Sequence, residues 1–282
     1  MTKYRIIHET IYEYSALVFF EPHYLRLKPK NTPHCSLKEF TLSISPEPEG
    51  FAEQIDMDNN LIYFCWFEGV HQHYEIKSES VVELEDYNPF NFIIYPDEFL
   101  KIPFSYADEQ RELLQPALWV MDLPQYLIEF GDDLIKKSGF NTVNFITVLT
   151  QQIHKQFAIE IREHGRPHDP DLTFQLKKGS CRDVAWMQIQ LLRYFGIAAR
   201  FTSGYFYIES DNPEFELHAW LEVFIPGAGW IGFDPSHGIA AGSSHIPVAN
   251  SAFIENTMPV TGSVRGDGSS ELKTNLIIEK LT

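Results

Sequence analysis

The 282-residue chain carries 39 acidic and 22 basic side chains, which gives a formal net charge of −17 at pH 7 and a pI near 5.0. This balance argues against non-specific binding to nucleic acid and against binding to an anionic membrane surface. Hydrophobic residues make up 44% of the chain and aromatic residues 14%, so a substantial core can form. The length allows two domains.

The chain start shows no signal-peptide pattern, and this, together with the cysteine content, favours a reducing compartment. The start of the chain, Met1-Thr2-Lys3-Tyr4, lacks the apolar segment of a signal peptide, and no run approaches the ~18 apolar residues of a membrane span. The three cysteines, Cys35, Cys65 and Cys181, are an odd number without CxxC spacing. A disulfide framework or zinc finger is therefore disfavoured, and we expect a cytoplasmic protein.

The first hundred residues have the pattern of antiparallel β-structure. From Tyr4 to Tyr14 the side chains alternate with period two and are rich in aromatic and β-branched residues, which is typical of a strand. Further strands are expected at residues 23–27, 37–45, 51–57, 61–67 and 73–84. A turn is expected at Asp58-Asn59-Asn60. Short strands at this spacing predict a β-sandwich domain over residues 1–100.

A second domain is predicted over residues 101–282, beginning with helices. Prolines interrupt residues 86–121, which we interpret as an ordered linker with a short helix near 106–114. Helical patterns follow near 125–138 and 143–157, and Gly139 fits the end of the first. Helices and strands then alternate to the end of the chain, so the fold class predicted for the whole protein is α+β.

Cys181 is predicted to open a buried helix. Ser180 is a suitable N-cap with Asp183 three residues later, and Gly196 fits the helix end. The partial positive charge at a helix N-terminus favours a thiolate, whereas the nearby Asp183 opposes it. A buried structural cysteine is the alternative interpretation.

His218 and Asp234 are predicted to meet at one end of a hairpin. Residues 218–225 alternate, with an aliphatic face assigned to the core and His218 on the other face, and residues 230–234 form the return strand. A four-residue loop between the strands would place His218 and Asp234 on opposite faces, so we predict a three- or five-residue loop or a bulge. The alternatives are a hydrogen-bonded surface histidine and an Asp-Pro turn.

A thiol, an imidazole and an orienting carboxylate are the three parts of an activated nucleophile, and Cys181, His218 and Asp234 occur in that order along the chain. The backbone N–H of Cys181 and the side-chain amide of Gln175 are candidate oxyanion donors. A metal site formed by Cys181, His218, Asp234 and His237 is an alternative, since these residue types also bind zinc.

Several segments together resemble bacterial transglutaminase-like proteins, which are related to papain-type cysteine enzymes. The resemblance covers nearly the whole chain. Its segments are His8-x-Thr10-x-Tyr12-x-Tyr14, Leu25-Arg26-Leu27-Lys28-Pro29, Gly179-Ser180-Cys181-Arg182-Asp183, the run from Arg193 to Phe201, Ser203-Gly204-Tyr205, His218-Ala219-Trp220, Gly229-Trp230 through Asp234-Pro235, and Pro259-Val260-x-Gly262.

The resemblance implies a papain-like core after the β-sandwich, with Cys181 as nucleophile, His218 as general base and Asp234 as orienting acid. The chain departs from the family pattern at Asp234-Pro235-Ser236-His237-Gly238, where the family usually has Asp-Pro-Thr-Asn-Gly. This departure leaves the three residues intact and concerns the side of the site that meets the substrate.

The expected activity is attack of Cys181 on an amide or ester carbonyl to form a thioester. We expect a cysteine protease, peptidase or amidase without a cofactor, acting on a peptide, a protein or a small amide. A protein-glutamine acyltransferase (a transglutaminase) and a catalytically silent binding or scaffold protein are the alternatives. The acidic balance favours neutral or cationic substrates. The oligomeric state is left open.

Overall fold

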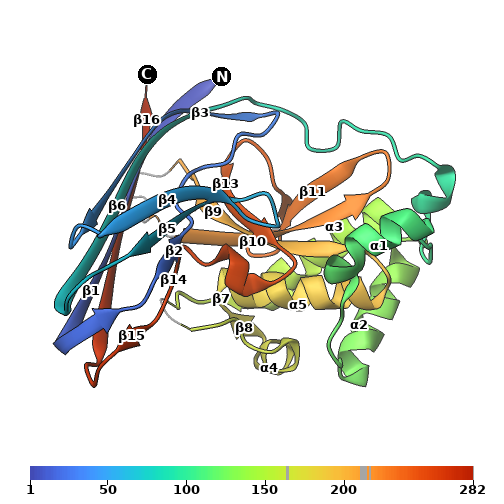
Figure 1. The fold of residues 1–282 in the computed structure, drawn as a ribbon. Helices are drawn as coiled ribbons and strands as arrows, with labels where there is room; N and C mark the ends of the chain where they lie inside the picture. Colours follow the sequence, from blue (N-terminus) through green and yellow to red (C-terminus); the bar gives the residue numbers. More distant parts are fainter. Residues whose placement is uncertain (163–164, 210–214, 216, 282) are drawn as a thin grey trace.

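An antiparallel β-sandwich forms the first part of the computed structural model, which describes residues 1–162, 165–209, 215 and 217–281. Its strands from this part of the chain are β1 (Thr2–Phe20), β2 (His23–Leu25), β3 (Cys35–Ser45), β4 (Gly50–Ile55), β5 (Leu61–Trp66) and β6 (His71–Leu84). β1, β6 and β3 share one sheet, and β2, β5 and β4 share the other. Phe20, Tyr74 and Ile76 are buried in the cluster that joins the sheets. The predicted sandwich is confirmed (Figure 1).

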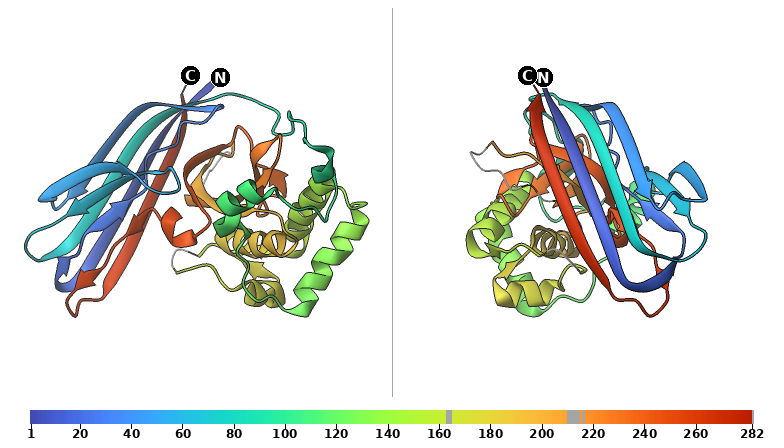
Figure 2. Two further views of the ribbon diagram at one scale, coloured as in Figure 1. Left: turned by 45° about the vertical axis from the view of Figure 1, so that its right-hand side comes forward. Right: turned by 90° about the vertical axis from the view of Figure 1, so that its left-hand side faces the viewer.

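The C-terminal strands return to this sandwich. They are β14 (Val260–Thr261), β15 (Val264–Arg265) and β16 (Ser270–Leu281). β16 pairs with β1 over its whole length, from Tyr14 opposite Ser270 to Lys3 opposite Leu281, and Figure 2 shows it beside β1. The predicted division, which assigned everything after residue 100 to the core, is therefore wrong for these strands. Pairing between the two ends of the chain leaves no local signal in the sequence.

Helices form the layer farthest from the sandwich (Figure 2). The segments before the core sheet are η1 (Asp97–Leu100), α1 (Asp108–Leu118), α2 (Gln125–Lys137), α3 (Thr142–Gln156), β7 (Ala158–Ile159), α4 (Pro170–Leu176), β8 (Lys178–Gly179) and α5 (Cys181–Tyr194). α2 and α3 confirm the predicted helices, and Gly139 follows α2 with a φ of 65°. The first predicted helix begins slightly later and extends to Leu118. Among the described helices, none is long and apolar enough to cross a membrane.

A five-stranded antiparallel sheet forms the centre of the core. Its order is β12 (Ile239–Ala240), β11 (Gly229–Asp234), β10 (Leu217–Ile225), β9 (Ala199–Phe206) and β13 (His245–Ser251). η2 (Ile254–Thr257) follows the last of these strands. Leu221 and Val223 of β10 are fully buried in the cluster that contains Leu192 of α5. The aliphatic face of β10 therefore packs toward α5, as its alternating sequence predicts.

The sandwich and the core sheet share a buried interface. Ile6 and Val82 of the sandwich belong to the same apolar cluster as Tyr205 and Ile246 of the core sheet. Tyr205 also meets the ring of His8, with its Oη 3.1 Å from His8 Nδ1. The two parts are thus held together by apolar packing with a buried polar contact.

Candidate active site

Cys181 is the first residue of α5, directly after the predicted N-cap. The backbone N–H of Ser180 donates to Asp183 Oδ2 at 2.7 Å, and the Ser180 side chain accepts the backbone N–H of Asp183, which forms the capping box. Ser180 Oγ also donates to Asp183 Oδ2, at 2.8 Å. Gly179 permits this approach, since a Cβ there would lie 2.8 Å from the Cβ of Asp183. Cys181 itself is partly exposed. The predicted helix start is confirmed, and it presents the thiol at a surface.

The carboxylate of Asp183 is compensated by a cation. Arg162 Nη2 lies 2.5 Å from Asp183 Oδ1, which also accepts the backbone N–H of His168 at 2.7 Å. Burial would raise the pKa of this carboxyl, but the hydrogen bonds from His168, Ser180 and Arg162 outweigh it and lower the pKa. The negative charge of Asp183, which the sequence suggested would lie unpaired near Cys181, is thus paired with Arg162.

The hairpin of β10 and β11 has the register that the predicted site requires. Leu221 lies opposite Phe233 and Ile225 opposite Gly229, which leaves three residues, 226–228, in the loop. In this register His218 and Asp234 fall on the same face of the sheet. The prediction of an odd loop is confirmed.

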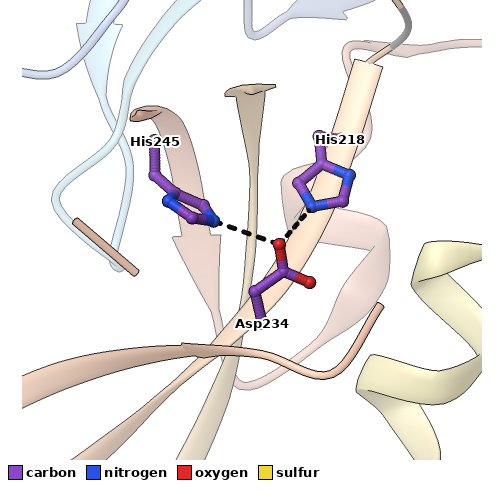
Figure 3. A group of neighbouring side chains, drawn as sticks. All are labelled: His218, Asp234 and His245. Atoms are coloured by element: carbon purple, nitrogen blue, oxygen red, sulfur yellow. Dashed lines mark hydrogen bonds and ion pairs between the residues drawn. The ribbon is translucent and has the colours of Figure 1, made fainter. Parts of the chain in front are cut away.

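His218 and Asp234 form a buried hydrogen-bonded pair. His218 Nε2 lies 2.8 Å from Asp234 Oδ2, and Figure 3 shows the imidazole pointing at this oxygen. Burial alone would lower the pKa of His218. The charge and hydrogen bond of Asp234, and then the interactions of His218 with Cys181, instead raise this pKa to about 10. Because Nε2 is engaged by Asp234, Nδ1 is the ring nitrogen available to Cys181.

Asp234 is the centre of a larger hydrogen-bond network. Its Oδ2 also meets His237 Nδ1 at 2.7 Å and His245 Nε2 at 3.1 Å, and its Oδ1 accepts the Ser236 hydroxyl at 2.5 Å. Asp234 is fully buried. Burial would raise its pKa, but the charge of His218 and the hydrogen bonds hold the pKa well below its usual range.

His245 was not predicted from the sequence. It comes from β13, eleven residues beyond Asp234, and Figure 3 shows it on the opposite side of Asp234 from His218. The backbone N–H of Gly242 donates to His245 Nδ1 at 3.2 Å, so the proton resides on Nε2 and His245 donates to Asp234. Ser236 and His237 lie two and three residues after Asp234, as in the Asp-initiated turns that a local pattern can predict. No local pattern points to His245.

The residues that could form a metal site in the structure differ from those that the sequence suggested. Among the residues that the structure describes, His218, Asp234 and His245 offer ligand atoms within 4.8 Å of one another. The sequence had suggested Cys181 and His237 as the partners of His218 and Asp234. The three imidazoles around Asp234 Oδ2 all lie at hydrogen-bond distances, between 2.7 and 3.1 Å. Hydrogen bonding to a buried carboxylate therefore accounts for the cluster.

Gln175 lies away from the thiol. It is exposed on α4, and its Nε2 donates to the Tyr126 hydroxyl at 2.8 Å and to Asp171 Oδ1 at 2.7 Å. It is also absent from the residues that line the cavity at Cys181. Lys177, with a φ of 52°, turns the chain between α4 and β8. The predicted oxyanion role of Gln175 is therefore not supported by the geometry.

A cavity of about 490 Å³ opens at Cys181 and His218. Its walls come from both parts of the molecule, with β1 and β16 of the sandwich on one side and β9, β10 and η2 of the core on the other. This volume falls within the ~300–1,000 Å³ of typical ligand sites. Cys181 and the histidine paired with Asp234 thus face one space that can hold a substrate.

Two family models match the chain. The bacterial transglutaminase-like N-terminal region matches residues 4–83, and the transglutaminase-like superfamily matches residues 134–235. The second match spans Cys181, His218 and Asp234. Together the two models cover most of the sandwich strands from the N-terminal part and the centre of the core.

The chain is similar in sequence to other bacterial proteins. The chain is 22% identical to an uncharacterised protein of Mycobacterium leprae, over the full length of both. It is 32% identical over 119 residues to a protein-glutamine gamma-glutamyltransferase of Pseudomonas aeruginosa. The matched region covers 38% of this chain and 18% of that protein.

The fold is similar to that of a proposed cysteine protease from Cytophaga hutchinsonii. The TM-score is 0.74 at 18% identity, and the match covers all of this chain and 91% of the other. The similarity therefore extends across both the sandwich and the core. With the two family matches and the α+β architecture, this identifies the chain as a member of the transglutaminase-like superfamily that carries the bacterial transglutaminase-like N-terminal region.

Proposed function

We propose that the protein is a cysteine hydrolase that cleaves an amide or ester bond through a thioester at Cys181. The observation that carries this proposal is the 2.8 Å contact of His218 with the buried Asp234, on the same cavity as the thiol at the start of α5. Such a constellation is recognised by geometry and by the role of each group rather than by position in the chain. A peptide, protein or small amide would be the substrate.

The chemistry follows from the three side chains. In the proposed resting state His218 Nδ1 already holds the Cys181 proton, because the pKa of His218 is about 10, and the thiolate attacks the carbonyl carbon to form a tetrahedral intermediate. His218 then gives the proton to the leaving amine or alcohol, and a thioester forms. Asp234 holds the imidazole through Nε2 and stabilises its charged form, which agrees with the raised pKa of His218.

The intermediate needs hydrogen-bond donors for its oxyanion. The backbone N–H of Cys181 at the start of α5 is suited to this role, because N–H groups in the first turn of a helix point along its axis without helical acceptors. A single donor of this kind is typically worth about 3 kcal/mol in the transition state.

Water is the proposed acceptor of the acyl group. A cationic amine acceptor would be favoured by an unpaired carboxylate beside the thioester. Glu160, a carboxylate that lines the cavity, instead lies 2.9 Å from Lys178. Amine transfer is the second candidate, and it is favoured by the 32% identity to the Pseudomonas aeruginosa protein-glutamine gamma-glutamyltransferase.

Mass spectrometry of a glutamine-containing peptide pool, with and without a primary amine, tests the proposal. Chain cleavage, deamidation and amine incorporation change peptide masses differently. We expect cleavage or deamidation by the wild type and at least about 10⁴-fold less by Cys181→Ala. Equal mass profiles for the two proteins would contradict the proposal and favour a binding or scaffold role. Metal analysis of the pure protein tests the metal alternative.

A further inference from the structure

One wall of the cavity is a continuous face of the β-sandwich. The lining residues from β1 and β16 form three neighbouring cross-strand pairs, which are His8 with Leu276, Thr10 with Thr274, and Tyr12 with Leu272. They are alternate residues of both strands, so all six side chains project from the same side of the sheet. The sandwich thus presents an ordered surface to the cavity that also contains Cys181 and His218.

This face is uncharged, although the protein has a net charge of −17. His8 is the titratable imidazole of the wall, and burial lowers its pKa to about 4, so it is neutral at pH 7. Its ring is held by contacts with the Tyr205 hydroxyl at 3.1 Å and Thr10 Oγ1 at 3.4 Å. Between residues 8 and 12 of β1 and between residues 272 and 276 of β16, the charged side chains are those of Glu9 and Lys273, which are intervening residues on the opposite face.

The side chains of Glu160, Arg162 and Arg182 at the cavity are already engaged. Glu160 lies 2.9 Å from Lys178, Arg162 lies 2.5 Å from Asp183, and Arg182 donates to the backbone carbonyl of Arg162. The core contributes several apolar side chains to the opposite wall, which are Phe201, Leu217, Ala219, Ile254 and Met258. A charged substrate group entering here would lose water without gaining an uncommitted partner among these charged side chains.

We propose that the sandwich face formed by β1 and β16 is the specificity wall of the active site, and that it selects an uncharged, mainly apolar side chain next to the attacked carbonyl. This inference rests on the proposed function of Cys181. It gives the N-terminal region a direct part in substrate recognition and narrows the substrates from neutral or cationic to neutral and apolar.

Thr274→Asp tests the wall, with Asn275→Asp as the matched control. Both positions are exposed on β16, so either substitution should leave the fold intact, but their side chains project from opposite faces of the sheet. The probes are two peptidyl chloromethyl ketones that differ in one side chain, leucine or lysine. Each alkylates Cys181 as the thiolate displaces chloride. Iodoacetamide serves as a small reference reagent, and the labelling rate of Cys181 is measured by mass spectrometry.

We expect the wild type and Asn275→Asp to react faster with the leucine reagent. Thr274→Asp should shift the leucine-to-lysine rate ratio toward lysine by about two- to fivefold, the effect of one new charge partner at an exposed position. Thr274→Trp should slow both peptidyl reagents while the iodoacetamide rate is retained, and Asn275→Trp should slow neither. Equal ratios for Thr274→Asp and Asn275→Asp would overturn the proposal.

Turnover separates this proposal from the proposed function. If the wild type hydrolyses no substrate but reagent preference follows Thr274, the wall is supported and the hydrolase assignment is wrong. If turnover depends on Cys181 but reagent preference ignores Thr274, the hydrolase assignment is supported and the specificity wall is wrong.

Discussion

The cysteines of the sandwich and the cysteine of the core occupy opposite environments. Cys35 and Cys65 are 3% and 0% exposed, and burial raises the pKa of each thiol to about 11. Cys181 is partly exposed at the first residue of α5 and lines the cavity with His218. The same residue type therefore serves as packing in one region and as an accessible thiol in the other, and the surroundings decide between them.

The two regions also differ in the polar groups that they bury. The centre of the sandwich is mainly aromatic and aliphatic, with residues such as Phe20 and Ile76. The active-site end of the core sheet buries Asp234, His218 and His245 in one network. A buried carboxylate is tolerated only with such partners. The core thus retains a costly polar cluster where the proposed chemistry needs it.

Loss of the Asp234 charge should have the largest effect. Asp234→Asn is expected to lower kcat by about 10³- to 10⁴-fold, because the imidazole loses the group that holds it and stabilises its charged form. Steady-state kinetics with the best peptide substrate measure this change. Asp133→Asn, on the exposed side of α2, is the control and should leave kcat unchanged. A loss of less than tenfold for Asp234→Asn would contradict the proposed role.

Native-state alkylation should separate the cysteines. At pH 7 we expect iodoacetamide to label Cys181 at least about 100-fold faster than Cys35 or Cys65, because a thiol with a pKa near 11 is ionised to only about one part in 10⁴. Peptide mapping gives each rate. His218→Ala should slow Cys181 alone, and unfolding in guanidinium should bring the three rates together. Uniform slow labelling of the native protein would remove the contrast between the regions.

His245 should act by positioning Asp234. His245→Phe removes a donor from a buried carboxylate, which costs about 1–3 kcal/mol, so we expect kcat to fall by about 10- to 100-fold. Because this hydrogen bond helps to lower the pKa of Asp234, the acidic limb of the kcat profile should move to higher pH. His245→Gln keeps a side-chain donor and should restore part of the activity. A fall in kcat with an unmoved pH profile would indicate a purely structural role.

The stability of the core should depend on the protonation of His218. Its pKa is raised to about 10 in the folded protein, compared with about 6.5 when unfolded. The resulting stabilisation is fully present below pH 6.5 and is lost as the pH rises through 10. The free energy of unfolding of the wild type should therefore exceed that of His218→Gln by more at pH 6 than at pH 10. Denaturant titrations at several pH values measure the difference, and a constant gap would contradict the raised pKa.

Local patterns predicted the elements that carry the site. Ser180 and Asp183 predicted the start of α5, and the alternation after His218 predicted β10 and its aliphatic face. His218 and Asp234 can share one face of the sheet only with certain loop lengths, so their spacing limited the predicted lengths of the hairpin loop. The observed loop has three residues, which is one of those lengths. These predictions succeeded because capping and strand alternation are set within a few residues.

Long-range neighbours could not be predicted in the same way. Nothing near Asp234 in the sequence indicated His245, and nothing near residue 8 indicated that β16 would pair beside it. Gln175 is only six residues from Cys181 in the sequence, but this spacing does not reveal the turn at Lys177. The side chain of Gln175 therefore bonds Tyr126 instead of pointing toward the thiol. The direction of a side chain depends on backbone turns that a simple residue count ignores.

The sequence by itself determined the α+β character, the helix headed by Cys181 and the chain order of thiol, imidazole and carboxylate, because these depend on local propensity and on residue chemistry. Only the tertiary structure decided that the C-terminal strand closes onto β1, that His245 supports Asp234 and that an uncharged sheet face stands across from the thiol. These features depend on packing between segments far apart in the chain, where burial and hydrogen-bond satisfaction select the partners.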